Sequence, residues 1–158
     1  MNKPAVLAQI LRQLEAELAL FTATAQATHA EATHEENKAE DKYDTRGLEA
    51  SYLAMGQLKQ AGEARQAVEA FAALNPRAFG PGEAIGLGAL VVLEGRGRNC
   101  YFIGPRAGGT EVETAGQTVL VITPQSPLGR QLIGRKQDDT LQLELGGRRG
   151  PARIAAVS

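Results

Sequence analysis

The sequence predicts an α+β protein, in which an N-terminal antiparallel α-helical coiled-coil hairpin precedes a small antiparallel β-sheet domain with one short helix. Three observations lead to this class. Residues 4–75 are rich in Ala, Glu, Gln and Leu and contain no internal proline. Asn75-Pro76 and a segment rich in Gly and Pro then end the helical pattern. Beyond residue 86 the apolar residues follow the period of strands. We therefore predict a hairpin over 1–75, a linker over 76–86 and a β-rich domain over 87–158.

The first helix carries a heptad seam, because its apolar positions alternate in steps of four and three residues. The seam comprises Leu7, Leu11, Leu14, Leu18, Phe21, Ala25, Thr28 and Ala32. The second helix has a looser stripe, made of Leu48, Tyr52, Met55, Leu58, Ala61, Val68, Phe71 and Leu74. A break over 41–47, with Asp and Thr capping residues and a glycine, divides the region nearly in half, as an antiparallel pair requires. The hairpin tip is therefore expected near 40–46.

The second half of the chain reads as strands joined by glycine-rich turns. We predict strands over 89–94, 99–103, 118–122, 140–145 and 152–157, with a short one over 111–113. Between the third and fourth long strands, Ser126 can cap a helix and Pro127 suits its first position. Gly134 can close that helix in a left-handed conformation. The pattern thus places one capped helix between two strands.

Composition excludes several classes of protein. Cys100 is the single cysteine, so neither an intramolecular disulfide nor a cysteine metal cluster is expected. No apolar run approaches the roughly 18 residues that span a bilayer, and the N-terminus does not read as a secretory signal. His29 and His34 are five residues apart and suit a metal site poorly. We expect a cytoplasmic protein without a membrane partner.

Charge is divided unevenly along the chain. Residues 1–75 hold eleven acids and seven Lys or Arg, or −4, whereas residues 76–158 hold seven and ten, or +3. The basic half could meet an acidic protein surface or, less readily for want of aromatic stacking platforms, a nucleic acid such as DNA. Its cationic residues are Arg96, Arg98, Arg130, Arg135, Lys136, Arg148, Arg149 and Arg153 among others.

The capped-helix segment carries a family resemblance. Ser-Pro-x-x-x-x-Leu-Ile-Gly over 126–134, followed by charged residues, an Asp-Asp pair and a strand, resembles the C-terminal domain of the Gre family of bacterial transcription elongation factors. The resemblance implies an FKBP-like domain without isomerase activity that docks on RNA polymerase. It implies docking through Ser126, Pro127, Arg130, Ile133, Gly134 and Arg135.

The hairpin tip holds two carboxylates with helical spacing, Asp41 and Asp44. Alone, such a pair would bind magnesium weakly, because that ion takes most of its ligands from water or substrate. The resemblance implies that the tip enters the secondary channel of RNA polymerase and lends both acids to a catalytic magnesium. The polymerase then cleaves the 3′ end of its backtracked transcript, so this chain, a monomer, is not itself an enzyme. Arg46, Lys59 and Arg65 would contact the phosphates of that nascent RNA.

Other interpretations of the same residues stay open. Asp41 and Asp44 are also typical helix caps, and the basic residues of the second helix are equally typical of a solvated face. After the first acid the family's Glu-Asn-Ala-Glu-Tyr run is replaced by Asp-Thr-Arg-Gly-Leu-Glu-Ala-Ser-Tyr, and the tip is similar to that of DksA-like factors. The alternative function is therefore a secondary-channel regulator or inhibitor that does not stimulate cleavage. A further alternative is a coiled-coil protein that self-associates through its seam.

Overall fold

The computed structural model describes residues 1–33 and 46–158, and these form two compact units. One unit comprises Met1–Arg12 with Glu69–Ser158, and the other comprises Gln13–Val68. Two long helices, α1 (Lys3–Thr33, 31 residues) and α2 (Arg46–Ala72, 27 residues), contribute to both units. The sheet and the short helix α3 belong wholly to the first unit. The predicted order of helical pair, sheet and short helix is confirmed.

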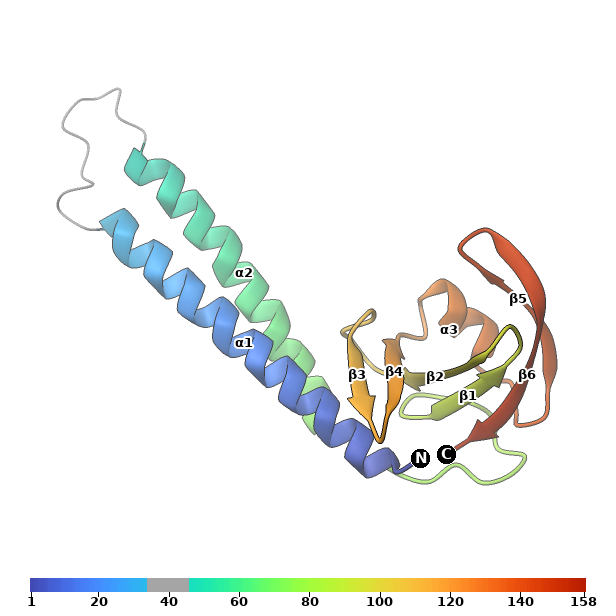
Figure 1. Cartoon of the computed structure of the whole chain (residues 1–158). Helices are drawn as coiled ribbons and strands as arrows, with labels where there is room; N and C mark the ends of the chain where they lie inside the picture. Colours follow the sequence, from blue (N-terminus) through green and yellow to red (C-terminus); the bar gives the residue numbers. More distant parts are fainter. Residues whose placement is uncertain (34–45) are drawn as a thin grey trace. The chain divides into compact units, whose positions relative to one another are not determined.

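In the unit Gln13–Val68, α1 and α2 run side by side in opposite directions (Figure 1). The predicted seam of α1 is confirmed, because Leu14 and Ala25 are buried while Leu18, Phe21 and Thr28 are half-buried. On α2 the buried positions of this unit are alanines, namely Ala54, Ala61 and Ala67. Small side chains on one helix leave room for the larger leucines and phenylalanine of the other.

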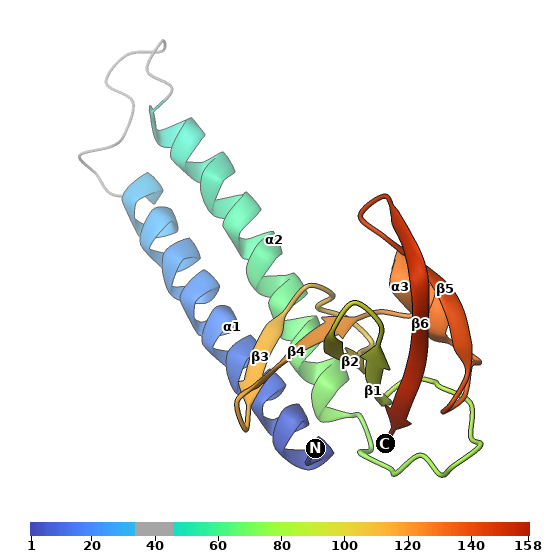
Figure 2. The ribbon, with the colours of Figure 1, turned by 45° about the vertical axis from the view of Figure 1, so that its right-hand side comes forward.

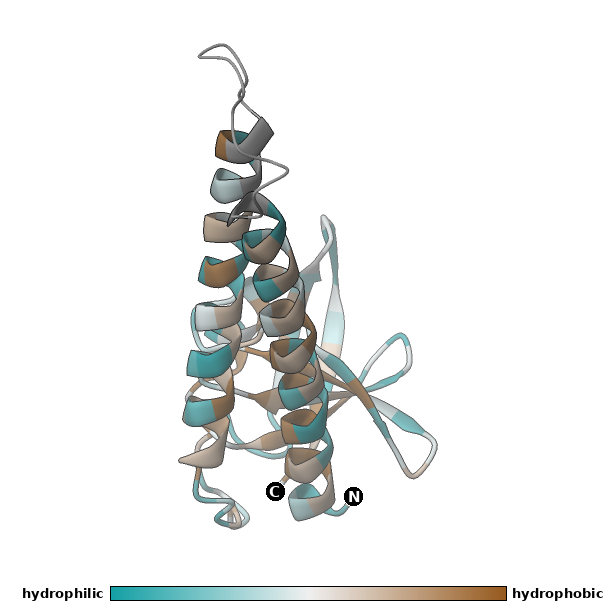
Figure 3. Ribbon diagram, turned by 90° about the vertical axis from the view of Figure 1, so that its left-hand side faces the viewer, coloured by the Kyte–Doolittle hydropathy of each residue, from teal (hydrophilic) through white to brown (hydrophobic). Residues whose placement is uncertain are grey.

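The predicted stripe of α2 is wrong in its first half. Leu48, Tyr52, Met55 and Leu58 are between 53% and 65% exposed. Ala54 and Ala61, seven residues apart, share a buried face, whereas Leu48, Tyr52 and Met55 lie about 100° or more from Ala54 around the helix axis. Figure 3 shows the mixture of apolar and polar residues along both helices. The second half of the stripe is correct, because Ala61 and Phe71 are buried.

Six strands form one sheet in the order β3-β4-β2-β1-β6-β5 (Figures 1 and 2). Their bounds are β1 (Leu90–Glu94), β2 (Arg98–Ile103), β3 (Glu111–Thr114), β4 (Gln117–Ile122), β5 (Thr140–Leu145) and β6 (Arg148–Val157). Neighbouring strands are antiparallel except for β2 and β4, which are parallel. The expectation of a wholly antiparallel sheet is corrected at this pair, because β3 forms a hairpin with β4 and thereby turns β4 alongside β2.

Each predicted strand is present, and the largest difference lies in β6. The sequence pattern predicts that this strand starts at residue 152, but β6 begins at Arg148. The turn contains only Gly146 and Gly147, whose φ angles are +57° and +74°. Two consecutive residues with positive φ form the tight hairpin turns that favour glycine. The remaining Arg148, Arg149 and Gly150 pair with β5.

Both faces of the central strands are buried. One face forms a core with Ile85 of the linker and Leu128 and Leu132 of α3. On the other face, Phe71 at the end of α2 lies against Phe102 of β2, with ring centroids 6.0 Å apart. Continuous burial along β1 and β2 follows from this two-sided packing. Cys100 is buried, and burial raises the pKa of its thiol.

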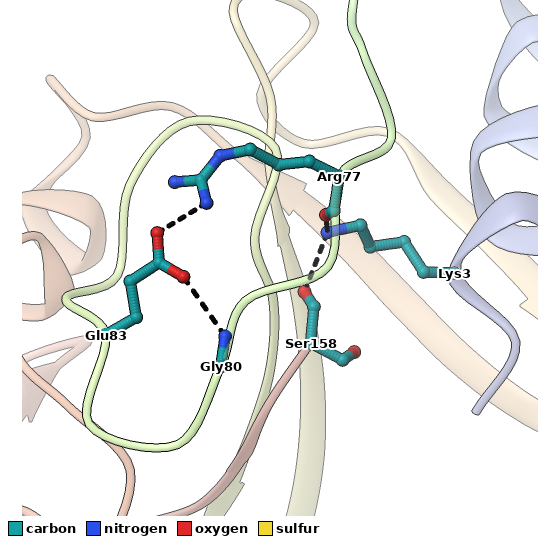
Figure 4. Close-up of polar contacts among 5 residues, drawn as sticks. All are labelled: Lys3, Arg77, Gly80, Glu83 and Ser158. Atoms are coloured by element: carbon teal, nitrogen blue, oxygen red, sulfur yellow. Dashed lines mark hydrogen bonds and ion pairs between the residues drawn. The ribbon is translucent and has the colours of Figure 1, made fainter.

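Lys3 joins the start of α1 to the linker and to Ser158, the residue that follows β6 (Figure 4). Its Nζ donates to the carbonyl of Arg77 and, at 2.9 Å, to that of Ser158. The ammonium group also lies 4.7 Å from the centre of the Phe79 ring. The Lys3 residue is only 6% exposed, and desolvation lowers its pKa, assisted by the nearby charge of Arg77. A buried, hydrogen-bonded cation thus ties three separate segments of one unit together.

Candidate functional site

The candidate site is the helix α3 (Pro127–Leu132) and its flanking residues. Ser126 is the N-cap with φ −64° and ψ 157°, and its Oγ accepts from the backbone N–H of Gly129 at 3.0 Å. The same hydroxyl donates to the carbonyl of Thr123 at 2.7 Å. Pro127 follows at the first helical position, where a backbone N–H is not needed. The predicted cap is therefore confirmed in both its residues.

Gly129 allows the start of α3 to lie directly against the preceding loop. A Cβ at this position would lie 1.9 Å from the carbonyl oxygen of Thr123 and 2.9 Å from the Oγ of Ser126. Only a residue without a side chain fits at that distance. Leu128 and Leu132 on the same helix are buried in the core of the sheet. The cap, the glycine and the two leucines fix the position of α3.

The C-terminal end of α3 is held by the linker. Ile133 is the C-cap, and its N–H donates to the carbonyl of Gly129 at 2.9 Å. Gly134 has φ +82°, as the sequence predicted, and donates to the carbonyl of Ile85 at 2.9 Å. Ile85 in turn donates to the carbonyl of Arg135 at 2.7 Å. These two reciprocal bonds fasten the linker to the end of the helix.

The outward side of this segment combines apolar and cationic groups. Pro127, Arg130 and Arg135 are exposed, and Ile133 is 38% exposed although it is a large apolar residue. Pro127 also borders a hollow of about 500 Å³ between α3 and the β5–β6 hairpin. An apolar centre beside two guanidinium groups suits an acidic protein surface with an apolar contact point. The structure thus brings the predicted docking residues into one segment of surface.

Gln131 closes the space between α3 and the edge strand β5. Its Nε2 donates to the carbonyl of Glu144 at 3.3 Å, and its Oε1 accepts from the N–H of Glu144 at 3.1 Å. Backbone groups of an edge strand are otherwise available to another strand. No local pattern predicts this pairing, nor the roles of Thr123 and Ile85, because each partner is distant along the chain or is a backbone group.

The remaining predicted site residues are on the helical pair. Asp41 and Asp44 lie outside the described residues. Arg46 begins α2, and Lys59 and Arg65 are exposed on the same helix. Lys59 and Arg65 are six residues apart, which corresponds to about 240° around the helix axis. Within the described part of α2, these two cations therefore do not lie on one face.

Residues 1–33 and 46–158 contain neither a cluster of metal-ligating side chains nor a membrane-spanning helix. No group of three or more His, Cys, Asp or Glu side chains is arranged there to hold a metal ion. Neither long helix within those ranges has an apolar stretch long enough to cross a membrane.

A paired helical segment followed by a six-stranded, mostly antiparallel sheet with one capped helix defines the class of fold. Solved structures with similar chains are Gre-type proteins, the family that the 126–134 segment resembles. GreA factor homolog 1 (Gfh1) of Thermus thermophilus is 24% identical, with 98% of this chain and 93% of that chain covered and a TM-score of 0.40. A second Gfh1 structure, described as a transcription factor, is 25% identical with a TM-score of 0.41, covering 93% and 92% of the two chains.

A third similar structure is the prokaryotic transcription elongation factor GreA/GreB from Nitrosomonas europaea. It is 20% identical, and the match covers 70% of this chain and 92% of that chain with a TM-score of 0.37. No family model matches this sequence, and no curated protein matches it.

Proposed function

We propose that this protein is a transcription factor of Gre type that binds RNA polymerase through its C-terminal domain. In this proposal the hairpin tip enters the secondary channel and stimulates cleavage of backtracked transcripts. The observation that carries the proposal is the α3 segment. Its sequence resembles the Gre family, and its folded form presents Pro127, Arg130, Ile133 and Arg135 outward from a fixed helix.

The rigidity of α3 supports a docking role. Residues that contact a partner lose less entropy on binding when their backbone is already fixed. Here Ser126 caps the helix, Gly129 packs against the carbonyl of Thr123, and Ile85 brackets the helix end. The exposed Ile133 supplies an apolar contact, and the arginines favour an acidic surface.

Asp41 and Asp44 are the residues proposed to hold magnesium together with the polymerase. Their hard oxygen donors are of the type that magnesium prefers. A second magnesium ion supplies stabilisation of the attacking or leaving oxygen in phosphoryl transfer. The two carboxylates would orient the ion, and the polymerase would perform the cleavage on the RNA 3′ end. Arg46, Lys59 and Arg65 are the proposed contacts for the RNA phosphates.

The direct test is transcript cleavage in stalled, backtracked elongation complexes with magnesium. We expect the wild-type protein to shorten the transcript and the Asp41→Asn/Asp44→Asn variant to lose this activity while still binding polymerase. Glu63→Gln, which removes an exposed acid of α2, is the matched control and should cleave normally. Cleavage that survives the loss of both tip acids would exclude the metal-lending mechanism.

Docking is tested separately, by the binding of fluorescently labelled protein to polymerase. The Arg130→Ala/Arg135→Ala variant should bind at least about tenfold more weakly, a change of about 1.4 kcal/mol. Arg106→Ala also removes an exposed arginine of the same unit, but far from α3 in sequence, and should bind normally. Equal binding by all three proteins would remove α3 as the docking site.

A second candidate function is a channel-binding regulator that inhibits transcription without stimulating cleavage. The tip sequence favours it, because the second acid is Asp44 and the Thr45-Arg46-Gly47 that follows departs from the family's run. The shorter Asp side chain reaches less far than Glu would. Polymerase binding together with reduced transcript synthesis, and without cleavage, would establish this function.

A further inference from the structure

A separate pocket of about 250 Å³ lies at the end of the sheet, where the β1–β2 turn and the β5–β6 hairpin meet. Its floor is apolar and is formed by Leu93, Tyr101, Leu143 and Ala152, one residue from each of four adjacent strands. Figure 2 shows the β1–β2 turn beside β6. None of the α3 residues assigned to docking lines this pocket, so it is a feature that the proposed function leaves unused.

Arg96 and Arg148 border the apolar floor, and no acidic residue lines the pocket. Arg96 comes from the β1–β2 turn and Arg148 from the start of β6. The next residue, Arg149, faces the other side of the sheet, where its ladder partner is Glu144.

In the described part of the chain, no hydrogen bond or ion pair engages the side chains of Arg96 and Arg148. By contrast, nearby Arg153 pairs with Glu94 at 3.3 Å and with Asp138 at 2.9 Å. The guanidinium groups that border this pocket have no acidic partner among the described residues, so the entrance of the pocket attracts an anion.

The β1–β2 turn, which carries Arg96, is held in place by close backbone packing. A Cβ on Gly95 would lie 2.9 Å from the carbonyl oxygen of Pro151 and 3.4 Å from the Cβ of Ala152. The β1–β2 turn therefore rests directly on β6. The Nε of Arg96 lies 3.9 Å from the Cβ position of Gly150, so the guanidinium group is beside the hairpin that carries Arg148. The backbone that carries Arg96 is therefore already positioned before an anion binds, which lowers the entropic cost of binding.

We propose that this pocket binds a nucleoside phosphate. Arginine forks match phosphate oxygens in bidentate geometry, and two of them balance a multiply charged phosphate group better than a single carboxylate. The apolar floor, which includes the Tyr101 ring, accepts a flat base, and Asn99 at the rim offers both a donor and an acceptor to the base edge. An extended peptide is less suited, because Gln131 already occupies the backbone groups of edge strand β5 at Glu144.

The test is a titration of the full-length protein with ADP and with GDP. Binding is monitored by amide chemical-shift changes and by calorimetry. We expect shifts confined to residues around 95–101 and 143–152, and saturable binding. Adenosine and inorganic phosphate should each bind at least about tenfold more weakly than ADP, because each supplies only half of the contacts. The Arg96→Ala/Arg148→Ala variant should also bind ADP at least about tenfold more weakly.

Arg106→Ala removes an exposed arginine outside the pocket and should bind ADP as the wild type does. Unchanged thermal unfolding of the double variant would show that its loss of binding is local. Absence of shifts at millimolar ADP and GDP would overturn the proposal. So would equal affinity for inorganic phosphate and ADP, or ADP binding that is equal in the double variant. Binding of single-stranded RNA without binding of free nucleotides would also overturn it.

Discussion

The carbonyl oxygen of Thr123 lies 1.9 Å from the point at which a side chain on Gly129 would begin. This contact couples the loop after β4 to the first turn of α3, and the Ser126 hydroxyl bonds to both sides of it. The position of the candidate docking surface therefore depends on a residue that has no side chain. It follows that glycine at 129 is a requirement of the fold and that the surface cannot be formed without it.

Gly129→Ala should destabilise the sheet-containing unit by more than about 2 kcal/mol, because the methyl group forces the loop or the helix to move. The free energy of unfolding, measured by denaturant titration, gives the effect. Gly62→Ala is the matched control, since a Cβ there meets nothing within 4 Å. In the interior of α2 this change should stabilise the protein by up to about 1 kcal/mol. Equal effects of the two substitutions would contradict the close contact at 129.

Ser126→Ala should cost about 1 kcal/mol of stability, because the N–H of Gly129 loses its side-chain acceptor. Ser126→Thr should restore most of that loss, since threonine also caps helices. Thermal or denaturant unfolding of the three proteins measures the differences. An alanine variant as stable as the wild type would show that the hydroxyl contributes nothing to the helix start.

Local signals explain why the sheet and α3 were predictable from the sequence. Strand periodicity, turn glycines and the Ser126-Pro127 pair each act within a few residues. The β5 bounds were predicted without error, and the other strands differ mainly at their ends. On α2 the burial of Ala61 was predicted, but that of Ala54 was missed, because burial there depends on which face meets α1. The large side chains of Leu48, Tyr52 and Met55 formed the more obvious pattern, although they are exposed.

Features that join distant segments were not predictable. The parallel pairing of β2 with β4 depends on the β3–β4 hairpin, and the bonds of Ile85 to the end of α3 are between backbone groups. Lys3 is a further example, because its partners are 74 and 155 residues away. Within the candidate site, a local cap predicted the helix α3 and the family resemblance predicted its docking residues. The arginines of the separate pocket are brought together by two turns that are distant in sequence.

The Glu83 carboxylate should make stability sensitive to acid. It accepts from the N–H of Gly80 and from Arg77, and these bonds lower its pKa below the ordinary value of 4.5. A lowered pKa in the folded state contributes stability that is complete above the unfolded-state pKa and is lost as pH falls through the folded-state value. Wild type should therefore exceed Glu83→Gln in unfolding free energy at neutral pH, and the difference should shrink below about pH 4.5.

The measurement is denaturant unfolding of both proteins from pH 7 to the acid limit of folding. Glu111→Gln, which removes an exposed acid from β3, serves as the control for general charge effects. A difference between wild type and Glu83→Gln that stays constant as pH falls would show that the Gly80 and Arg77 contacts do not favour the ionised carboxylate.

Lys3 should act in the opposite pH range. Burial lowers its pKa, so the folded state releases its proton at a lower pH than the unfolded chain, whose lysine keeps the ordinary value of 10.5. The unfolded state then binds more protons within that interval, and stability rises with pH there. Lys3→Met removes this rise and also leaves the carbonyls of Arg77 and Ser158 without their donor, at a cost of about 1–3 kcal/mol.

Unfolding free energies of wild type and Lys3→Met, measured from neutral pH towards 10.5, give both effects. The advantage of the wild type should already be present at neutral pH, where the amine donates to two carbonyls, and should grow as pH rises. Lys136→Met removes an exposed lysine of the same unit and should produce neither effect. A wild-type advantage that instead declines towards pH 10.5 would mean that the folded protein favours the charged form of the Lys3 amine. The attraction of the two carbonyls and the Phe79 ring for that charge would then outweigh its desolvation.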